Sequence, residues 1–252
     1  MIAEQRLNEI LQILTEQEFV EVADLSARLN VSTMTIRRDL QKLSKMNLIQ
    51  RRYGGAMLVA DISSENDYSY KKTQHQASKQ KLAQIALAQI HDNDILFLDA
   101  GTTTYELSVL LQQRQNLTII TNDIAIATDL CKKDIDVILL GGSLQKATLS
   151  TLGPITIDYL KHFRVTSAFL GANAISAGFD VHTPTIEKAY LKKAALQIAQ
   201  KSYLMVDNSK FNSYALNRFA SLSDFTGVIT DRLFSSDEQH RLSNLFVNIL
   251  SE

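Results

Sequence analysis

Clusters of glycine, hydroxyl, amide and charged residues directly follow apolar runs in the last two thirds of the chain. The first cluster is Asp99-Ala100-Gly101-Thr102-Thr103-Thr104. Its glycine lets a backbone approach a ligand closely, and threonine hydroxyls and amides at the start of a helix suit a phosphate. The later clusters share this chemistry: Thr121-Asn122-Asp123, Gly141-Gly142-Ser143, Gly171-Ala172-Asn173, Asp207-Asn208-Ser209-Lys210 and Thr230-Asp231. These residue types together fit a phosphorylated polyol.

Individual members of these clusters have assignable roles and also plainer explanations. Asp99, Asn122 and Asp123 can bond sugar hydroxyls, and Lys210 can supply a point charge. Taken singly, such residues are common at strand ends, where they form helix caps and tight turns. A site is favoured only because the clusters would all gather at one edge of a parallel sheet, where α/β folds bind ligands.

A second set of residues could bind phosphate of another kind. Between residues 28 and 57 seven basic residues stand against one acidic residue, whereas residues 1–24 hold one basic residue against six acidic ones. The formal net charge of the whole chain is only −1. Positive charge gathered on one short segment of a near-neutral protein is an electrostatic footprint for nucleic acid. The alternative is a solvated charged helix in an ordinary helical domain.

The elements that position this basic segment follow from periodicity. Ser32 is suited to be the N-cap of a helix whose apolar stripe is Ile36, Leu40 and Leu43. Leu25 and Leu29 mark a preceding helix, with Asn30-Val31 as the turn, and a still earlier helix uses Leu7, Ile10, Leu11 and Leu14. Asn47 is a candidate C-cap, and residues 48–52 and 56–59 are expected to pair as strands through Tyr53-Gly54-Gly55. The pattern predicts a winged helix-turn-helix.

Such a motif is expected to contact DNA through its recognition helix and its wing. Met34, Arg38, Gln41 and Lys45 would face outward from that helix, flanked by Thr35, Arg37 and Lys42. The residues we assign to DNA binding are Ser32, Thr35, Arg37, Arg38, Gln41, Lys45, Arg51, Arg52, Gly54 and Gly55.

The rest of the chain alternates short apolar runs with helical patterns. The predicted strands lie at 95–98, 117–120, 137–140, 168–170, 203–206 and 228–229. The predicted helices lie at 79–91, 105–111, 124–132, 155–161, 187–200 and 237–250. Continuous apolar strands separated by helices predict an α/β unit with a mostly parallel sheet covered on both faces.

The motifs of both segments resemble one protein family. Val31-Ser32-Thr33-Met34-Thr35-Ile36-Arg37-Arg38-Asp39-Leu40 with Arg52-Tyr53-Gly54-Gly55-Ala56 resembles the N-terminal signature of the DeoR family of bacterial transcriptional regulators. Two departures are Asn47, where the family usually has Gly, and Tyr53, where it often has His.

The resemblance continues through the later motifs and implies a sensor domain similar in fold to ribose-5-phosphate isomerases. Asp99-Ala-Gly-Thr-Thr, Thr121-Asn122, Gly141-Gly142 and Asp207-Asn-Ser-Lys210-Phe211 occur in the family's order. It implies that Gly101, Thr102 and Thr103 form the phosphate cradle. Glu187 and Lys192 are weaker effector-binding candidates, with a solvated surface pair as the equal alternative.

Composition and length bound the remaining possibilities. We expect a DNA-binding domain at 1–60, a linker at 61–78 and a sugar-phosphate-sensing domain at 79–252. The single Cys131 excludes an internal disulfide and fits a reducing cytoplasm. The five histidines show no metal spacing, and no run approaches 18 apolar residues. We therefore expect no metal, no cofactor, no catalytic residue and no membrane segment.

These observations predict a cytoplasmic transcription factor, most simply a repressor of a carbohydrate operon. It would bind double-stranded operator DNA as a homodimer or homotetramer, with its affinity modulated by a phosphorylated sugar. Two alternatives stay open. One is a sugar-phosphate isomerase or deaminase with a DNA-binding appendage, using Asp99, Asp123 or Glu187 as base. The other is a constitutive DNA-binding or scaffold protein with a silent sensor fold.

Overall fold

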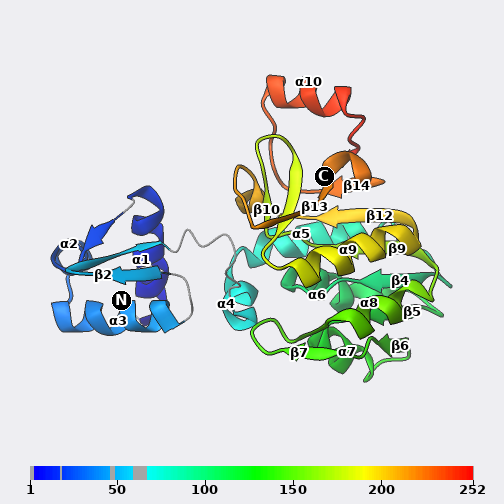
Figure 1. Ribbon diagram of the computed structural model, residues 1–252, viewed down its shortest axis with the longest axis horizontal. Helices are drawn as coiled ribbons and strands as arrows, with labels where there is room; N and C mark the ends of the chain where they lie inside the picture. Colours follow the sequence, from blue (N-terminus) through cyan, green and yellow to red (C-terminus); the bar gives the residue numbers. More distant parts are fainter. Residues whose placement is uncertain (1–2, 18, 46–48, 59–66, 252) are drawn as a thin grey trace. The chain divides into compact units, whose positions relative to one another are not determined.

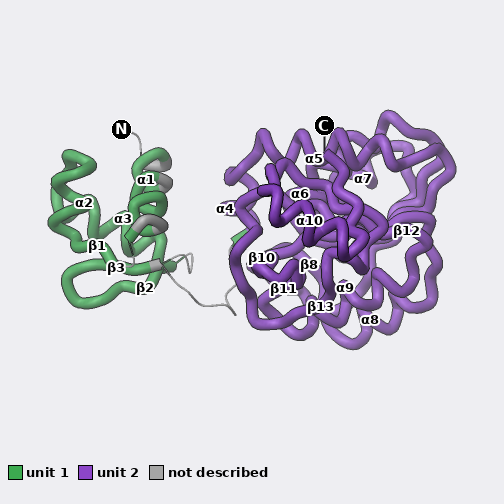
Figure 2. The backbone as a smooth tube through the Cα atoms, turned by 90° about the horizontal axis from the view of Figure 1, so that it is seen from above, with its two compact units in different colours: residues 1–67 green, residues 68–252 purple. Residues whose placement is uncertain are grey.

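The chain forms two compact units, residues 1–67 and residues 68–252 (Figure 2). The computed structural model describes residues 3–17, 19–45, 49–58 and 67–251. The division differs from the linker predicted at 61–78, because residues 68–78 include one helix and the start of another in the second unit. Asn47, Leu48, Val59 and residues 60–66 lie outside the described residues.

The N-terminal unit is a three-helix domain with a small antiparallel sheet. Its helices are α1 (Ala3–Glu16), α2 (Val22–Leu29) and α3 (Thr33–Lys45), and its strands are β1 (Val20–Glu21), β2 (Ile49–Arg52) and β3 (Gly55–Leu58). The sheet order is β1-β3-β2. The predicted wing is present, and the structure adds β1, which at two residues is too short to show an alternating pattern.

The core of this unit is the one that periodicity indicates. Ile10, Leu25, Ile36 and Leu40 are each at most 1% exposed. Asn30 ends α2 with φ 50°, so the left-handed turn predicted between α2 and α3 is confirmed. This core fixes which side of α3 faces solvent.

Two different structural reasons explain why glycine occupies positions 54 and 55 of the wing turn. Gly54 has φ +81°, a backbone conformation that side chains rarely adopt. A Cβ on Gly55 would lie 2.3 Å from the carbonyl oxygen of Val20 and 2.6 Å from the ring of Phe19. The close approach of β1 to β3 therefore explains Gly55, and this residue is buried.

The C-terminal unit is built on a seven-stranded parallel sheet (Figure 1). Its order is β15-β14-β12-β9-β4-β5-β6, and neighbouring strands within it pair in parallel. The strands are β4 (Ile95–Leu98), β5 (Thr118–Thr121), β6 (Asp136–Leu139), β9 (Val165–Leu170), β12 (Ala199–Met205), β14 (Gly227–Ile229) and β15 (Ile249–Leu250). The predicted mostly parallel α/β fold is confirmed.

Helices cover both faces of this sheet. They are α5 (Gln76–Leu87), α6 (Thr102–Leu110), α7 (Ile124–Leu130), α8 (Pro154–Lys161) and α9 (Ile186–Ile198), while α4 (Tyr68–Thr73) packs on α6 and α10 (Ser236–Asn244) follows β14 in the chain. Leu96 and Leu98 of β4 belong to one apolar cluster with α5, α6 and α7. Phe97, between them, belongs to the other cluster, with α8 and α9. The alternation of neighbouring residues between clusters shows a strand buried on both faces.

Two small antiparallel sheets add to the C-terminal unit. One has the order β10-β11-β13, from β10 (Ala174–Ile175), β11 (Asp180–Thr183) and β13 (Asn217–Ser221). The other is the hairpin of β7 (Ser143–Gln145) and β8 (Ser150–Leu152). The sequence analysis did not predict either sheet, because their strands are short and carry no sustained alternation.

Two predicted helices extend into residues that form strands in the structure. The helix predicted at 237–250 is wrong beyond residue 244, since Ile249 and Leu250 form β15 and pair with β14. The helix predicted to residue 200 ends at Ile198, and β12 begins at Ala199. In both cases apolar residues fit either element by pattern, and pairing with the sheet decides between them.

Candidate functional site

The surface of α3 presents basic side chains on a well-capped helix. The backbone N–H of Thr35 donates to the Ser32 hydroxyl at 3.2 Å, which confirms the predicted N-cap. Ser32 is exposed and Thr35 is half-buried, and their two hydroxyl oxygens lie 2.9 Å apart. The other residues predicted to bind DNA from this helix are all exposed: Arg37, Arg38, Gln41 and Lys45.

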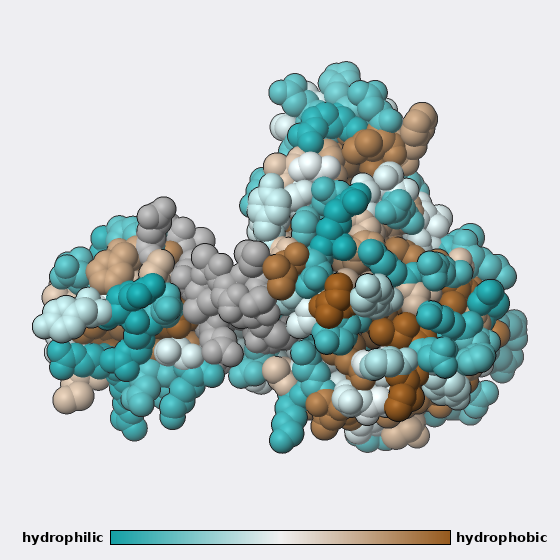
Figure 3. Space-filling model, viewed as in Figure 1, coloured by the Kyte–Doolittle hydropathy of each residue, from teal (hydrophilic) through white to brown (hydrophobic). Residues whose placement is uncertain are grey.

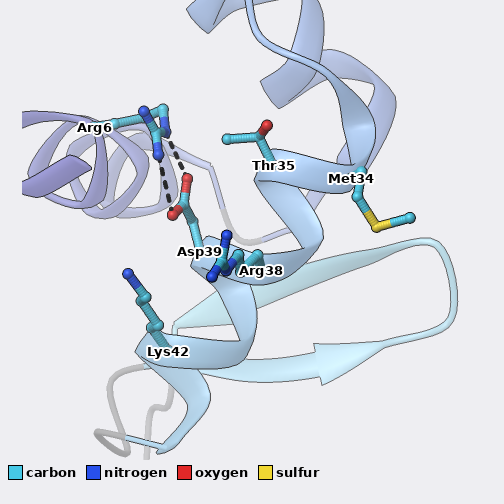
Figure 4. Close-up of a pocket in the computed structure, with 6 residues that line it drawn as sticks. All are labelled: Arg6, Met34, Thr35, Arg38, Asp39 and Lys42. Carbon is cyan, nitrogen blue, oxygen red and sulfur yellow. Dashed lines mark hydrogen bonds and ion pairs between the residues drawn. The ribbon is translucent and has the colours of Figure 1, made fainter. Parts of the chain in front are cut away.

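A buried ion pair holds α3 against α1 beneath this surface (Figure 4). Arg6 of α1 donates to Asp39 of α3 from Nε at 2.6 Å and from Nη2 at 3.3 Å. The Asp39 side chain is 3% exposed. The pair lies in a pocket lined by Arg6, Met34, Thr35, Arg38, Asp39 and Lys42. Sequence reasoning counted Asp39 only as a charge, and its place beside Leu40 was the signal that it faces inward.

The wing adds further basic groups next to an exposed aromatic ring. Arg51 and Arg52 on β2 are exposed, and Arg52 Nη2 donates to the Gln50 amide oxygen at 3.2 Å. Tyr53, which was not among the predicted DNA-binding residues, is fully exposed at the turn beside Gly54. Gly55 is buried, so its backbone is less accessible than that of Gly54.

In the C-terminal unit, the end of β4 carries a buried ion pair. Lys192 of α9 donates to a carboxylate oxygen of Asp99, and also to the carbonyl of Gly171 at 2.9 Å. Asp99 is 3% exposed and Lys192 is 5% exposed. The alternative of a solvated Glu187–Lys192 surface pair is wrong, because Lys192 is buried on Asp99 while Glu187 is exposed.

The loop after β5 is bonded directly to the loop after β4. Asn122 accepts from the Ala100 N–H at 3.1 Å, and Asp123 accepts from the Gly101 N–H at 3.1 Å. The other Asp123 oxygen caps α7, and burial raises the pKa of this carboxyl to about 6. Thr121 is buried and donates to the Leu98 carbonyl at 2.7 Å. These side chains therefore fix the shape of the edge.

The start of α6 is the open element at this edge. Among the described residues no side chain caps this helix, and its first backbone bond is from Tyr105 N–H to the Gly101 carbonyl. Thr102 is 7% exposed and Thr103 is half-buried. Gly101 has an extended backbone, and a Cβ there would meet only the Thr104 hydroxyl at 3.5 Å, an ordinary contact. No contact among the described residues requires glycine at this position.

The Gly141-Gly142 turn is arranged differently. Gly142 has φ +149°, and a Cβ on it would lie 2.0 Å from the Thr156 hydroxyl of α8. Thr156 also donates to the Gly141 carbonyl at 2.7 Å. Packing against α8 thus explains Gly142, whereas a Cβ on Gly141 would meet nothing within 4 Å.

Charged groups also meet where β12 ends. Asp207 is 2% exposed, and among the described residues its Oδ2 has no hydrogen-bond partner. Lys79 of α5 is 4% exposed and donates to the Lys71 carbonyl. Burial first, and the nearby charge of Lys210 second, lower the pKa of Lys79 to about 8. Sequence reasoning missed Lys79.

The spacing of α5 held a signal for Lys79, because it precedes Leu82, Ala83 and Ala86 by three, four and seven residues on the buried face. Within the described ranges, no group of three or more metal-ligating side chains exists, and no helix is long and apolar enough to span a membrane.

A winged helix-turn-helix with an exposed basic helix, followed by a parallel α/β domain with an uncapped helix at its strand ends, defines a two-domain DNA-binding regulator. Residues 6–61 match the DeoR-like helix-turn-helix domain, and residues 74–232 match the DeoR C terminal sensor domain. The chain belongs to the DeoR family of transcriptional regulators.

Relatives of similar length carry regulator names. The chain is 30% identical to the HTH-type transcriptional regulator GlpR of Haloferax volcanii over 99% of this chain and 98% of that protein. It is 32% identical to the glycerol-3-phosphate regulon repressor of Escherichia coli over 90% of each. It is 33% identical to the lactose phosphotransferase system repressor of Streptococcus mutans over 92% of this chain and 93% of that protein. The protein is accordingly a transcriptional regulator.

Proposed function

We propose that this protein represses a carbohydrate-metabolism operon and that a phosphorylated sugar bound in the C-terminal unit changes its affinity for operator DNA. The observation that supports a phosphorylated ligand is the uncapped N-terminus of α6. This helix directly follows Gly101, where a Cβ would make only an ordinary contact. Free N–H groups and the helix dipole attract an anion there. Relatives named as repressors of the glycerol-3-phosphate regulon and of a lactose phosphotransferase system support this class of ligand.

For DNA, the exposed face of α3 is assigned to the major groove and the wing to the backbone or minor groove. Arg37, Arg38 and Gln41 would reach base edges or phosphates, and Arg51 and Arg52 would contact phosphate. Ser32 and Thr35 would contribute through the helix start, and Gly54 through the wing turn. The Arg6–Asp39 ion pair supports this assignment because it fixes the rotation of α3 against α1.

For the effector, the phosphate is assigned to Gly101, Thr102 and Thr103. Asp99, Asn122 and Asp123 use most of their polar atoms to bind neighbouring loops, so we assign them mainly to shaping the site. Lys210 is half-buried after β12, which is separated from β4 by β9, and it supplies positive charge to the same edge of the sheet. Glu187 lies exposed on α9 and has the weakest support among the predicted ligands.

A homodimer or homotetramer is the expected functional form, since one recognition helix covers few base pairs. Brown, apolar patches interrupt the hydrophilic surface of the larger unit (Figure 3). Exposed apolar residues occur in i, i+4 pairs on two packed helices: Ile155 and Tyr159 on α8, and Ile186 and Tyr190 on α9. These pairs are candidates for a subunit interface, and we expect the protein to act in the cytoplasm.

Fluorescence anisotropy on DNA from the gene's own upstream region tests the proposal. At fixed salt, sugar phosphates such as fructose 6-phosphate and glycerol 3-phosphate are added alongside their unphosphorylated parents, with Arg38→Ala as the DNA-binding control. We expect one ester, and not its parent, to change DNA affinity by about 5–150-fold. DNA binding that no ester alters would contradict the effector assignment.

A further inference from the structure

Helix α4 is the first element of the C-terminal unit and follows the segment that leads from the DNA-binding unit. Its first residue, Tyr68, donates its backbone N–H to the Ala147 carbonyl at 2.7 Å. Farther along, the Lys71 carbonyl accepts from Lys79, and the Lys72 ammonium lies 4.4 Å from the centre of the Tyr105 ring. The helix is therefore fastened at three points to the C-terminal unit.

The side chain of Tyr68 is enclosed, and its hydroxyl has no partner. Tyr68 is 9% exposed, and within the described part of the chain its hydroxyl oxygen is buried without a hydrogen bond. Its ring meets the Tyr105 ring edge-on, with centroids 6.5 Å apart. Buried hydroxyls are nearly always hydrogen-bonded, and leaving one unpaired costs free energy. Such a group calls for an acceptor that enters the site.

The residues around this hydroxyl adjoin the elements that carry the candidate effector site. Tyr105, which packs on it, lies in the first turn of α6, next to the proposed phosphate cradle. Ala147 lies in the β7–β8 hairpin, which is joined to the loop after β5 by the Ile124 N–H to the Leu149 carbonyl at 2.9 Å. Burial, and then the charge of Asp123 on that loop, raise the pKa of Tyr68, so the phenol stays a hydrogen-bond donor.

We propose that Tyr68 donates its hydroxyl to the bound phosphorylated effector and that α4 thereby passes occupancy of the site to the segment leading to the DNA-binding unit. This inference rests on the proposed function. It names Tyr68 as the residue that couples effector binding to the segment leading to the DNA-binding unit. Asp67 is the last residue of the N-terminal unit, and α4 begins at the next residue.

The physical basis is linkage between ligand binding and the docking of α4. An effector oxygen that accepts from Tyr68 removes the cost of its unpaired hydroxyl only while α4 is docked. The effector therefore binds the docked form more tightly and raises its population. Because coupling is reciprocal, a change at α4 must alter both effector affinity and the response of DNA binding.

The test compares Tyr68→Phe with Tyr70→Phe in the full-length protein. Tyr68→Phe removes one oxygen and keeps the ring on Tyr105. Tyr70 is the matched control, since it lies two residues along the same helix, about 200° round it, and is half-buried. Calorimetry with glycerol 3-phosphate, fructose 6-phosphate and inorganic phosphate measures binding. Anisotropy at saturating ligand measures the remaining shift in DNA affinity.

We expect Tyr68→Phe to weaken binding of the active ester by about tenfold or more, as for a lost hydrogen bond to a charged group. We also expect a smaller shift in DNA affinity at saturation, and no effect of Tyr70→Phe. Wild-type binding with an unaltered Tyr68→Phe variant would overturn the inference alone. A full DNA response in Tyr68→Phe at saturation would overturn the role of α4. A wild-type protein that binds no phosphate compound would overturn the proposed function and this inference together.

Discussion

The basic side chains of α3 are exposed to solvent, whereas the charged pair at the end of β4 in the C-terminal unit is buried. Arg37, Arg38 and Lys45 extend from a helix fixed from behind by one ion pair. Asp99 and Lys192 are at most 5% exposed and bind each other. The α3 surface presents its charges to solvent, where a large polyanion such as DNA can reach them. At the end of β4, by contrast, the charged side chains hold the surrounding loops in place.

This comparison separates residues that would contact a partner from residues that hold the site together. On α3, substitution of an exposed residue should change binding and leave stability alone. At the strand ends, substitution of a buried charge should change stability first.

Lys192→Met should have the largest effect on stability. It leaves the Asp99 carboxylate buried without its cation, which typically costs about 3–5 kcal/mol. Urea unfolding of the full chain measures the free energy of unfolding, with the exposed neighbour Lys193→Met as control, expected within about 0.5 kcal/mol of wild type. Equal stability of the two variants would contradict the buried ion pair.

Asp123 should make the C-terminal unit less stable as the pH rises. Burial raises its pKa from 3.8 to about 6, so the folded state binds the proton more tightly than the unfolded state. This stabilisation, roughly 3 kcal/mol, is present below pH 3.8 and is lost as the pH rises through about 6. Asp123→Asn should lack this decline in unfolding experiments between pH 4 and pH 7. If the free energy of unfolding of the variant declined equally over this pH range, the decline would belong to another titrating group.

Arg38→Ala should weaken operator binding by about 1–3 kcal/mol without unfolding the protein. Its side chain is exposed on α3, so the loss would come from DNA contacts alone. Anisotropy at fixed salt measures the effect. Arg164→Ala, which removes an exposed arginine of the C-terminal unit, is the charge-matched control. Equal DNA affinity of the two variants would contradict the assignment of α3 to the DNA interface.

Two glycine substitutions should separate stability from ligand binding. Gly142→Ala places a methyl 2.0 Å from the Thr156 hydroxyl at φ +149° and should cost about 1–3 kcal/mol. Gly101→Ala meets only an ordinary contact and should leave stability within about 0.5 kcal/mol. We expect Gly101→Ala nevertheless to lose phosphate binding by calorimetry. Unchanged ligand affinity in this variant would contradict the cradle.

The sequence predicts the elements of both units because their signals are local. The stripe of Ile36, Leu40 and Leu43 and the cap at Ser32 lie within twelve residues, and each strand of the large sheet up to β14 contains a short apolar run. The two-residue strands β1 and β15 are too short to carry such a signal, so their partners in the sheet decide them.

The buried ion pairs could not be predicted in the same way. Arg6 and Asp39 are 33 residues apart, and Asp99 and Lys192 are 93 residues apart. The sequence predicts which candidate residues gather at the strand ends, because the carboxyl ends of parallel strands lie at the same edge of the sheet. Which of them bind each other, and which stay open to a ligand, depends on the tertiary fold.

The central claim is that the DNA-binding surface of α3 is coupled to an effector site at the start of α6. Its most direct test is to measure the DNA affinity of wild type and of Gly101→Ala, each with and without the active sugar phosphate. The account predicts equal DNA affinity for both proteins in the absence of the ester, and a shift on its addition for wild type alone. An equal shift in both proteins would show that the effector does not bind at the start of α6.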